Sequence, residues 1–148
     1  MKKHTLGIDI GSTTVKIAIL DENDTLVFSD YERHFANIQE TLADLLQKAE
    51  DQLGELTLCP VITGSGGLTL ANHLEVPFVQ EVIAVSTSLQ KLAPKTDVAI
   101  ELGGEDAKII YFENAFCRWV HLPAQPVPQQ LPCRSPCRAD GRMRRPWP

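Results

Sequence analysis

The sequence predicts an α/β fold in which a mixed sheet is flanked by helices. Apolar runs of strand length alternate with stretches of helical periodicity, and glycine-bearing turns follow two of the strands. The expected order is three strands, a helix, a strand, two helices and two strands. Such an order is typical of a mixed sheet with helices packed on its faces.

Six longer apolar runs and one short run carry the strand signal. The first three lie at residues 5–10, 15–21 and 24–32, with a polar turn at 21–24. The other strands are expected at 58–63, 76–79, 97–102 and about 107–112.

The clearest helix is expected at residues 37–53. Asn37 can cap it, and Glu40 stands three residues later, as in a capping box. Gly54 ends it, as glycine commonly does directly after a helix. Its apolar stripe indicates core packing and consists of Ile38, Leu42, Leu45, Leu46, Ala49 and Leu53.

Two further helices are expected later in the chain. One is short and follows the Gly64-Ser65-Gly66-Gly67 turn, for which a strand-to-helix turn and a role near a ligand or a second subunit both stay open. The other spans roughly 80–93 and stops at Pro94. Its buried stripe is expected to be Val82, Val85, Leu89 and Leu92.

The composition divides the chain into two unlike parts. Residues 1–115 carry 8 basic and 18 acidic side chains, whereas residues 116–148 carry 6 basic and 1 acidic, together with 7 of the 10 prolines. Prolines at these intervals interrupt helices and strands, so residues 116–148 are expected to be disordered or irregular.

Charge and hydropathy exclude several classes of function. An acidic body argues against nucleic-acid binding, which needs clustered positive charge. The chain has no apolar run near 18 residues, so no membrane span is expected. The basic start reaches Asp9 too soon for a signal peptide, and we therefore expect a cytoplasmic protein with reduced cysteines.

Residues 7–16 form the most informative stretch. An apolar strand leads into a turn, and a second apolar strand follows, which indicates a hairpin built to hold phosphate. Asp9, at the end of the first strand, can hold Mg²⁺ through water, and Lys16 can neutralise phosphate charge. The candidate phosphate-binding residues are Gly11, Ser12, Thr13, Thr14 and Lys16. An ordinary hairpin with a polar turn is the alternative.

A second acid-x-glycine turn lies about 92 residues later, at 101–108. Glu101 precedes Gly103 and Gly104, and Lys108 follows. Two such hairpins can face one another and grip the phosphates of a nucleotide from both sides. Glu101 is then a second candidate metal ligand, with a structural strand-end acid as its alternative, and Asp106 is a weaker candidate for orienting water.

These two turns resemble the first and second phosphate loops of the actin, sugar-kinase and heat-shock-chaperone superfamily. Residues 6–16, 63–67 and 101–114, with Glu81, resemble more narrowly the ATP-dependent activators of 2-hydroxyacyl-CoA dehydratases, also called CoA-substrate-specific enzyme activases. These are grouped with the ATPase subunits of benzoyl-CoA reductase. The resemblance covers about residues 4–114.

The resemblance implies an actin-like ATPase with a ribonuclease H-like first lobe. It implies ATP and Mg²⁺ as cofactors, with Asp9 and Glu101 on the metal side and Asp106 near the attacking water. In that family a homodimer shares one 4Fe-4S cluster, and ATP hydrolysis drives an electron to a partner dehydratase or reductase that acts on CoA esters.

The chain departs from that family after Asn114. The family continues with a Cys-Ala-Gly-Gly-Thr-Gly-like segment that supplies a cluster ligand, and Cys117, Cys133 and Cys137 match no such position. We therefore expect a first lobe at 4–94, the start of a second lobe at 95–114, and a tail at 115–148. A frameshifted or truncated reading of a larger gene accounts for the tail, and a short paralogue with a new tail is the alternative.

The predicted function is the N-terminal part of such an ATPase, incomplete and weakly active or inactive by itself. Two other classes stay open. A sugar or acetate kinase would use similar loops to transfer the phosphoryl group to a bound substrate. A non-catalytic interaction module would keep the fold and bind no nucleotide.

Overall fold

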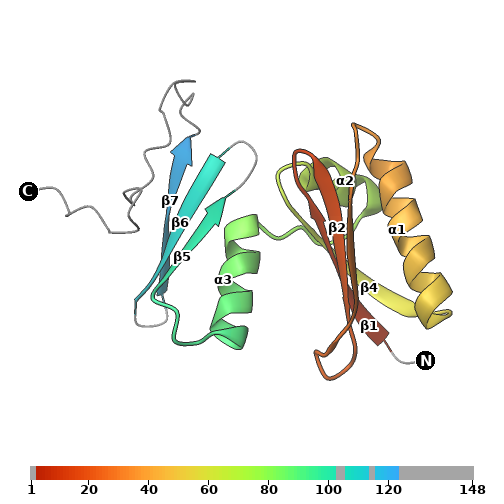
Figure 1. The fold of residues 1–148 in the computed structure, drawn as a ribbon, viewed down its shortest axis with the longest axis horizontal. Coiled ribbons are helices and arrows are strands. Elements are labelled where there is room, and N and C mark those ends of the chain that lie inside the picture. The colour runs from red at the N-terminus through yellow and green to blue at the C-terminus, as the bar shows by residue number, and fades with distance from the viewer. Residues whose placement is uncertain (1–2, 103–105, 114–115, 124–148) are drawn as a thin grey trace, which may run out of the picture.

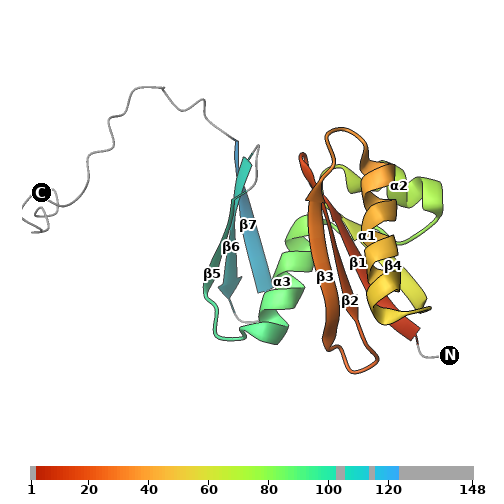
Figure 2. The same cartoon turned by 45° about the vertical axis from the view of Figure 1, so that its right-hand side comes forward.

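A computed structural model describes residues 3–102, 106–113 and 116–123. Within these residues the chain forms two sheets with helix α3 between them (Figures 1 and 2). The elements in order are β1 (Lys3–Ile10), β2 (Thr14–Leu20), β3 (Leu26–Arg33), α1 (Ile38–Leu53), β4 (Thr57–Thr63), α2 (Gly67–Leu74), α3 (Glu81–Leu92), β5 (Val98–Leu102), β6 (Asp106–Glu113) and β7 (Phe116–Pro123).

The first sheet is the mixed sheet that the sequence predicts. Its strands lie in the order β3-β2-β1-β4, with antiparallel pairing from β3 to β1 and parallel pairing between β1 and β4. The expected short strand at 76–79 is reduced to a single parallel bridge between Ile62 and Phe78.

One face of this sheet makes the core. Alternate residues of β1 and β2 point to that face, because side chains alternate along a strand. Helices α1 and α2 cover it, as the views in Figures 1 and 2 show together with the contacts of the core. The core residues from these strands and helices are Leu6, Ile8, Ile10, Val15, Ile17, Ile19, Phe28, Leu42, Leu45, Ala49, Ile62 and Ala71.

Helix α1 begins differently from the prediction. The capping box is wrong, because the Asn37 side chain accepts no hydrogen bond from the helix backbone and instead donates one to the Glu40 carboxylate. Thr41 Oγ1 donates to the Asn37 carbonyl at 2.8 Å. The expected glycine end is confirmed: Gly54 has φ +78° and donates its N–H to Glu50 O at 2.8 Å.

Helix α3 buries less of its stripe than expected. Val82 and Ser86 are buried, and the Ser86 hydroxyl donates to the Val82 carbonyl at 2.7 Å. Leu92, expected in the buried stripe, is 82% exposed. It is the last helical residue, where the chain turns away toward Pro94.

The second sheet has the order β5-β6-β7, with antiparallel pairing throughout. The prediction of irregular chain from residue 116 is wrong over Phe116–Pro123, which pairs along the whole of β6. The strand carries Phe, Trp and Val, which favour extended structure. Pro123 stands at its end, where the missing N–H interrupts no ladder. The rest of the expected tail, 124–148, lies outside the described residues.

In the part of the chain that the structure describes, no helix has the length and apolar character needed to cross a membrane.

Candidate functional site

The turn between β1 and β2 carries the predicted phosphate-binding residues. Gly11 donates its N–H to Thr14 O at 2.9 Å, which closes the turn. Ser12 and Thr13 are exposed at its tip. The structure thus brings Gly11, Ser12, Thr13 and Thr14 together on one accessible turn.

Gly11 itself is not required by the packing of the chain. A Cβ atom there would meet only Thr14 O and Thr14 Oγ1, each at 3.6 Å, which is ordinary contact. Gly11 also lacks the positive φ that would demand glycine, since the described glycines with positive φ are Gly54 and Gly64. A need for glycine at this position would come from a ligand.

Asp9 and Lys16 form an ion pair across the two strands beside this turn. Lys16 Nζ lies 2.7 Å from Asp9 Oδ2, and the two residues are directly opposite in the β1–β2 register. The Lys16 side chain is 51% exposed, so the pair contributes at most about 1 kcal/mol to folding. Lys16 is therefore free to exchange this partner for a phosphate at little cost in stability.

The second oxygen of Asp9 is in a different environment. Asp9 Oδ1 is buried, and it has no hydrogen-bond partner among the described residues. A buried carboxylate oxygen without a donor is costly unless a cation or water meets it. Carboxylate oxygen is also a ligand that Mg²⁺ prefers, so this atom fits the predicted magnesium site.

The turn after β4 closes over Asp9. Gly66 donates its N–H to Ile10 O at 2.9 Å. Gly64 has φ +94°, and a Cβ there would lie 2.3 Å from Ile10 O and 2.5 Å from Asp9 Oδ1. The glycine that the site requires is thus Gly64, which the sequence left open between a plain turn and a role near a ligand.

His34 supports the β1–β2 turn, and sequence reasoning missed it. Its Nδ1 accepts the Ala36 N–H at 3.1 Å, so Nε2 carries the proton and donates to Gly11 O at 3.2 Å. Its own backbone N–H donates to Thr13 O at 3.1 Å. In the sequence, a single histidine after a strand gives no signal that it supports a turn. The structure shows this contact because the His34 side chain is buried, with 8% exposure, against the β1–β2 turn.

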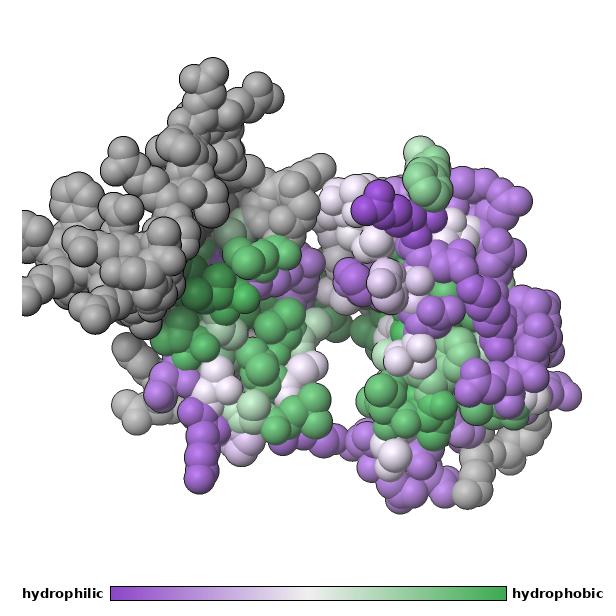
Figure 3. All heavy atoms as spheres, in the orientation of Figure 1, coloured by the Kyte–Doolittle hydropathy of each residue, from purple (hydrophilic) through white to green (hydrophobic). Residues whose placement is uncertain are grey.

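A cleft lies between the second face of the four-stranded sheet and α3. Its volume is about 690 Å³, and its walls include Gly7, Ala18 and Val61 from the sheet and Ile83 and Thr87 from α3. Figure 3 shows an opening through the molecule at this place. Asp9, Lys16 and Thr63 line one end of the cleft.

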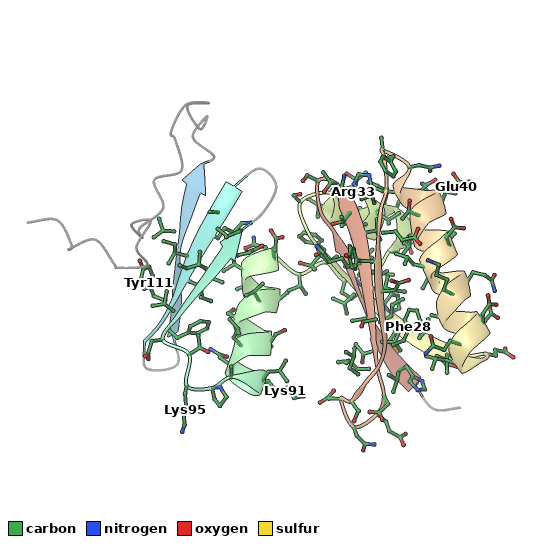
Figure 4. The ribbon with its side chains drawn as sticks, in the orientation of Figure 1. Phe28, Arg33, Glu40, Lys91, Lys95 and Tyr111 are labelled. Atoms are coloured by element: carbon green, nitrogen blue, oxygen red, sulfur yellow. The ribbon has the colours of Figure 1, made fainter. Side chains whose placement is uncertain are left out.

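The far end of α3 is tied to the same sheet by an ion pair. Lys91, labelled in Figure 4, contacts the Asp24 carboxylate in the β2–β3 turn. Both side chains are more than half exposed, so this pair adds little stability.

The second predicted loop is only partly described. Glu101 lies on β5 with its Oε1 3.7 Å from Lys108 Nζ, and Lys108 Nζ also donates to Glu81 Oε2 at 2.8 Å. Lys108 is 13% exposed, so it lies between two carboxylates of β5 and α3 in a partly desolvated place. Gly103, Gly104 and the side chain of Asp106 lie outside the described residues.

The two predicted loops lie at the same end of the molecule. Figures 1 and 2 show the carboxyl end of β5 and the β1–β2 turn directed to one end, on either side of α3. No described contact joins Asp9 to Glu101, and a shared phosphate site between the loops stays a prediction.

Comparisons by sequence find no match for this chain. No family model matches it. No curated protein matches it.

Solved structures do match it. The activator of the 2-hydroxyisocaproyl-CoA dehydratase from Clostridium difficile, with bound ADPNP, superposes with TM-score 0.66 and 24% identity, over 80% of this chain and 46% of that one. Component A of the (R)-2-hydroxyglutaryl-CoA dehydratase from Acidaminococcus fermentans gives TM-score 0.66 and 21% identity, over 79% and 47%. The ethanolamine utilization protein EutJ from Carboxydothermus hydrogenoformans gives 0.60 and 13%, over 81% and 52%.

This chain therefore spans about half the length of these proteins. The TM-scores of 0.60 to 0.66 establish the fold, and identities of 13 to 24% show no more than the fold. The chain adopts the predicted actin-like ATPase fold, and activators of 2-hydroxyacyl-CoA dehydratases are among its structural relatives.

Proposed function

We propose that this chain is the N-terminal part of an ATPase that activates a CoA-ester dehydratase or reductase by ATP-driven electron transfer. The observation that carries the proposal is the buried Asp9 Oδ1 at the foot of an exposed hydroxyl-rich turn. The likeness to an activator with bound ADPNP supports the choice of nucleotide.

The residues present suit Mg²⁺ bound together with a nucleotide. In the described residues no group of three or more His, Cys, Asp or Glu side chains could hold a metal ion. Mg²⁺ is commonly held by one or two carboxylates, waters and the substrate's own phosphates, so such a group is unnecessary. Asp9 would supply the carboxylate, with Glu101 as the proposed second acid and Asp106 proposed to orient water.

The turn residues would bind the polyphosphate. Exposed Ser12 and Thr13 offer hydroxyl and backbone donors, and Lys16 offers a charge that its ion pair with Asp9 holds only weakly. Gly103 and Gly104 are proposed to bind from the other side. Catalysis in such a site is mainly positioning and charge stabilisation, which Mg²⁺ supplies when bound.

An open apolar face supports the view that the chain is part of a larger fold. On the second sheet, alternate residues of β5 and one residue of β7, with β6 between them, point to the same side and are exposed. These residues are Val98 (46%), Ile100 (65%), Leu102 (79%) and Val120 (48%). A contiguous apolar face of this kind is normally covered by protein. Without the covering half, we expect weak nucleotide binding and no measurable turnover.

The electron-transfer part of the proposal rests on the resemblance and on the two dehydratase components among the structural relatives. It implies a partner enzyme acting on a CoA ester and a homodimer that shares a 4Fe-4S cluster. We assign no residue of this chain to that cluster.

The proposal is tested by an amide NMR titration of the 148-residue chain with a non-hydrolysable ATP analogue, with and without Mg²⁺. The expected result is Mg²⁺-dependent shifts at the amides of residues 11–14 and 64–67, because these turns surround Asp9. The Gly54 amide, at the opposite end of α1, is the internal control and should not shift.

The matched variant is Asp9→Asn, which keeps the size of the side chain. It should retain weak binding without Mg²⁺ and lose the Mg²⁺-dependent part. Absence of any shift at residues 11–14 in the wild-type chain contradicts nucleotide binding. The non-catalytic interaction module would then be the favoured function.

A further inference from the structure

Thr63, the last residue of β4, is a second buried polar group beside Asp9. Its Oγ1 is buried and has no hydrogen-bond partner among the residues that the structure describes. Most buried hydroxyls in proteins are hydrogen-bonded, so an exception needs a physical reason.

The register of the sheet brings Thr63 to the site. Asp9 is paired with Lys16 on one side and with Thr63 on the other. Paired residues of neighbouring strands point to the same face, so the three side chains form one row across β2, β1 and β4. All three line the cleft below α3.

The two carboxylate oxygens of Asp9 have different neighbours in this row. Lys16 meets Asp9 Oδ2 at 2.7 Å, which leaves Asp9 Oδ1 on the side of β4. Gly64, directly after Thr63, packs over that same Oδ1 so closely that no side chain would fit. Within the part of the chain that the structure describes, two buried oxygens without donors thus lie in adjacent strands. One belongs to a carboxylate and the other to a hydroxyl that can both donate and accept.

We propose that Thr63 is a positioning residue of the magnesium site, whose hydroxyl holds a water molecule that also contacts Asp9 Oδ1. This inference rests on the proposed function and adds a residue to it. Outer-sphere partners of this kind orient a ligand of the ion, and their loss costs about 10- to 100-fold in metal affinity. A water needs two or more polar partners, which these two oxygens provide.

The test compares Thr63→Val with wild type by two measurements on the 148-residue chain. The first is the ratio of affinities for a non-hydrolysable ATP analogue with and without Mg²⁺. Thr63→Val should reduce this ratio by about tenfold, with unchanged affinity in the absence of Mg²⁺. Thr63→Ser, which keeps the hydroxyl, should retain most of it.

The second measurement is the melting temperature without nucleotide or cation. Valine replaces a hydroxyl that has no partner in the described residues by a methyl group, so the melting temperature should stay the same or rise. Thr57→Val is the matched control, because Thr57 lies on the same strand and face six residues earlier, paired with Lys3. It should leave the Mg²⁺ ratio unchanged.

Two results overturn the inference and leave the proposed function intact: an unchanged Mg²⁺ ratio in Thr63→Val, or a melting temperature that falls in Thr63→Val and not in Thr63→Ser. The second would show that the hydroxyl bonds to protein. A wild-type chain whose affinity does not depend on Mg²⁺ at all overturns both the inference and the magnesium site.

Discussion

The two faces of the four-stranded sheet are built from different kinds of side chain. On β1, Leu6, Ile8 and Ile10 point to the face covered by α1 and α2, and they are 3%, 3% and 0% exposed. Gly7 and Asp9 alternate with them and point to the cleft below α3. Large aliphatic side chains thus fill one face, and small or polar ones leave the other accessible.

This difference predicts that stability and binding depend on opposite faces of a single strand. The packed face excludes water from branched aliphatic side chains, which is the main favourable term in folding. Among the described residues, the open face has two buried oxygens without protein donors, which costs stability and is typical of functional sites. Neighbouring residues of β1 are therefore expected to contribute to different properties, one to stability and the next to binding. Single substitutions can test the two properties separately.

The largest expected effect is on the packed face. Leu45 of α1 is fully buried against the sheet, so Leu45→Ala should lower the free energy of unfolding by about 2–5 kcal/mol. Denaturant unfolding followed by circular dichroism measures it. Leu92→Ala is the control, because Leu92 is 82% exposed and its truncation should change stability by about 0.5 kcal/mol or less. Equal losses in the two variants would contradict the packing described for α1.

An intermediate effect is expected where β4 turns over the site. In Gly64→Ala the new Cβ would overlap Ile10 O and Asp9 Oδ1, and φ at +94° is unfavourable for alanine. We expect a loss of about 1–3 kcal/mol or more. Chemical denaturation again measures it, with Gly11→Ala as the control, since a Cβ at Gly11 meets only contacts of 3.6 Å. A loss in Gly11→Ala as large as in Gly64→Ala would show that the first turn is the strained one.

The smallest effect concerns a turn remote from the site. Asp21 Oδ1 accepts the Thr25 and Asn23 N–H groups at 2.9 and 2.8 Å, and hydrogen bonds from these backbone donors, that of Thr25 first, lower the pKa of Asp21. Its contribution is therefore present above the ordinary value of about 3.9 and is lost as the pH falls through the lowered folded pKa.

Thermal unfolding of wild type and Asp21→Ala between about pH 6 and about pH 2 tests this. The wild type should melt slightly higher near pH 6, and the difference should disappear toward pH 2. A difference that grows as the pH falls has the opposite sign and would contradict the assignment.

The sequence predicts most of the fold because the packed face leaves a strong pattern. Ile8, Ile10, Val15 and Ile17 alternate at the period of a strand, and α1 carries its apolar residues at helical spacing. The candidate site was proposed from a local pattern, an acid two residues before a glycine at the end of the first strand, which is where Asp9 stands. Its role in binding stays a prediction.

Other features depend on contacts that a linear pattern does not carry. Strand β7 was not predicted, because the many prolines after it indicated irregular structure for the whole segment. Pairing with β6 needs only the residues up to Pro123. His34 and Thr63 reach the site through the turn at Gly11 and the register with Asp9, and neither is close to Asp9 in sequence. Whether Glu101 shares a ligand with Asp9 depends on an arrangement of two sheets that no local spacing specifies.

The most direct test of the account compares two neighbours on β1 that point to opposite faces, Ile8→Ala and Asp9→Asn. For each variant the free energy of unfolding, the melting temperature and the Mg²⁺-dependent affinity for a non-hydrolysable ATP analogue are measured on the same preparation. Ile8→Ala should lower the free energy of unfolding by about 2–5 kcal/mol and retain the Mg²⁺ dependence below its melting temperature. Asp9→Asn should change the melting temperature by about 5 °C or less and lose that dependence. Retained Mg²⁺ dependence in Asp9→Asn, or a loss of stability equal to that of Ile8→Ala, would contradict the division between a packed face and a binding face.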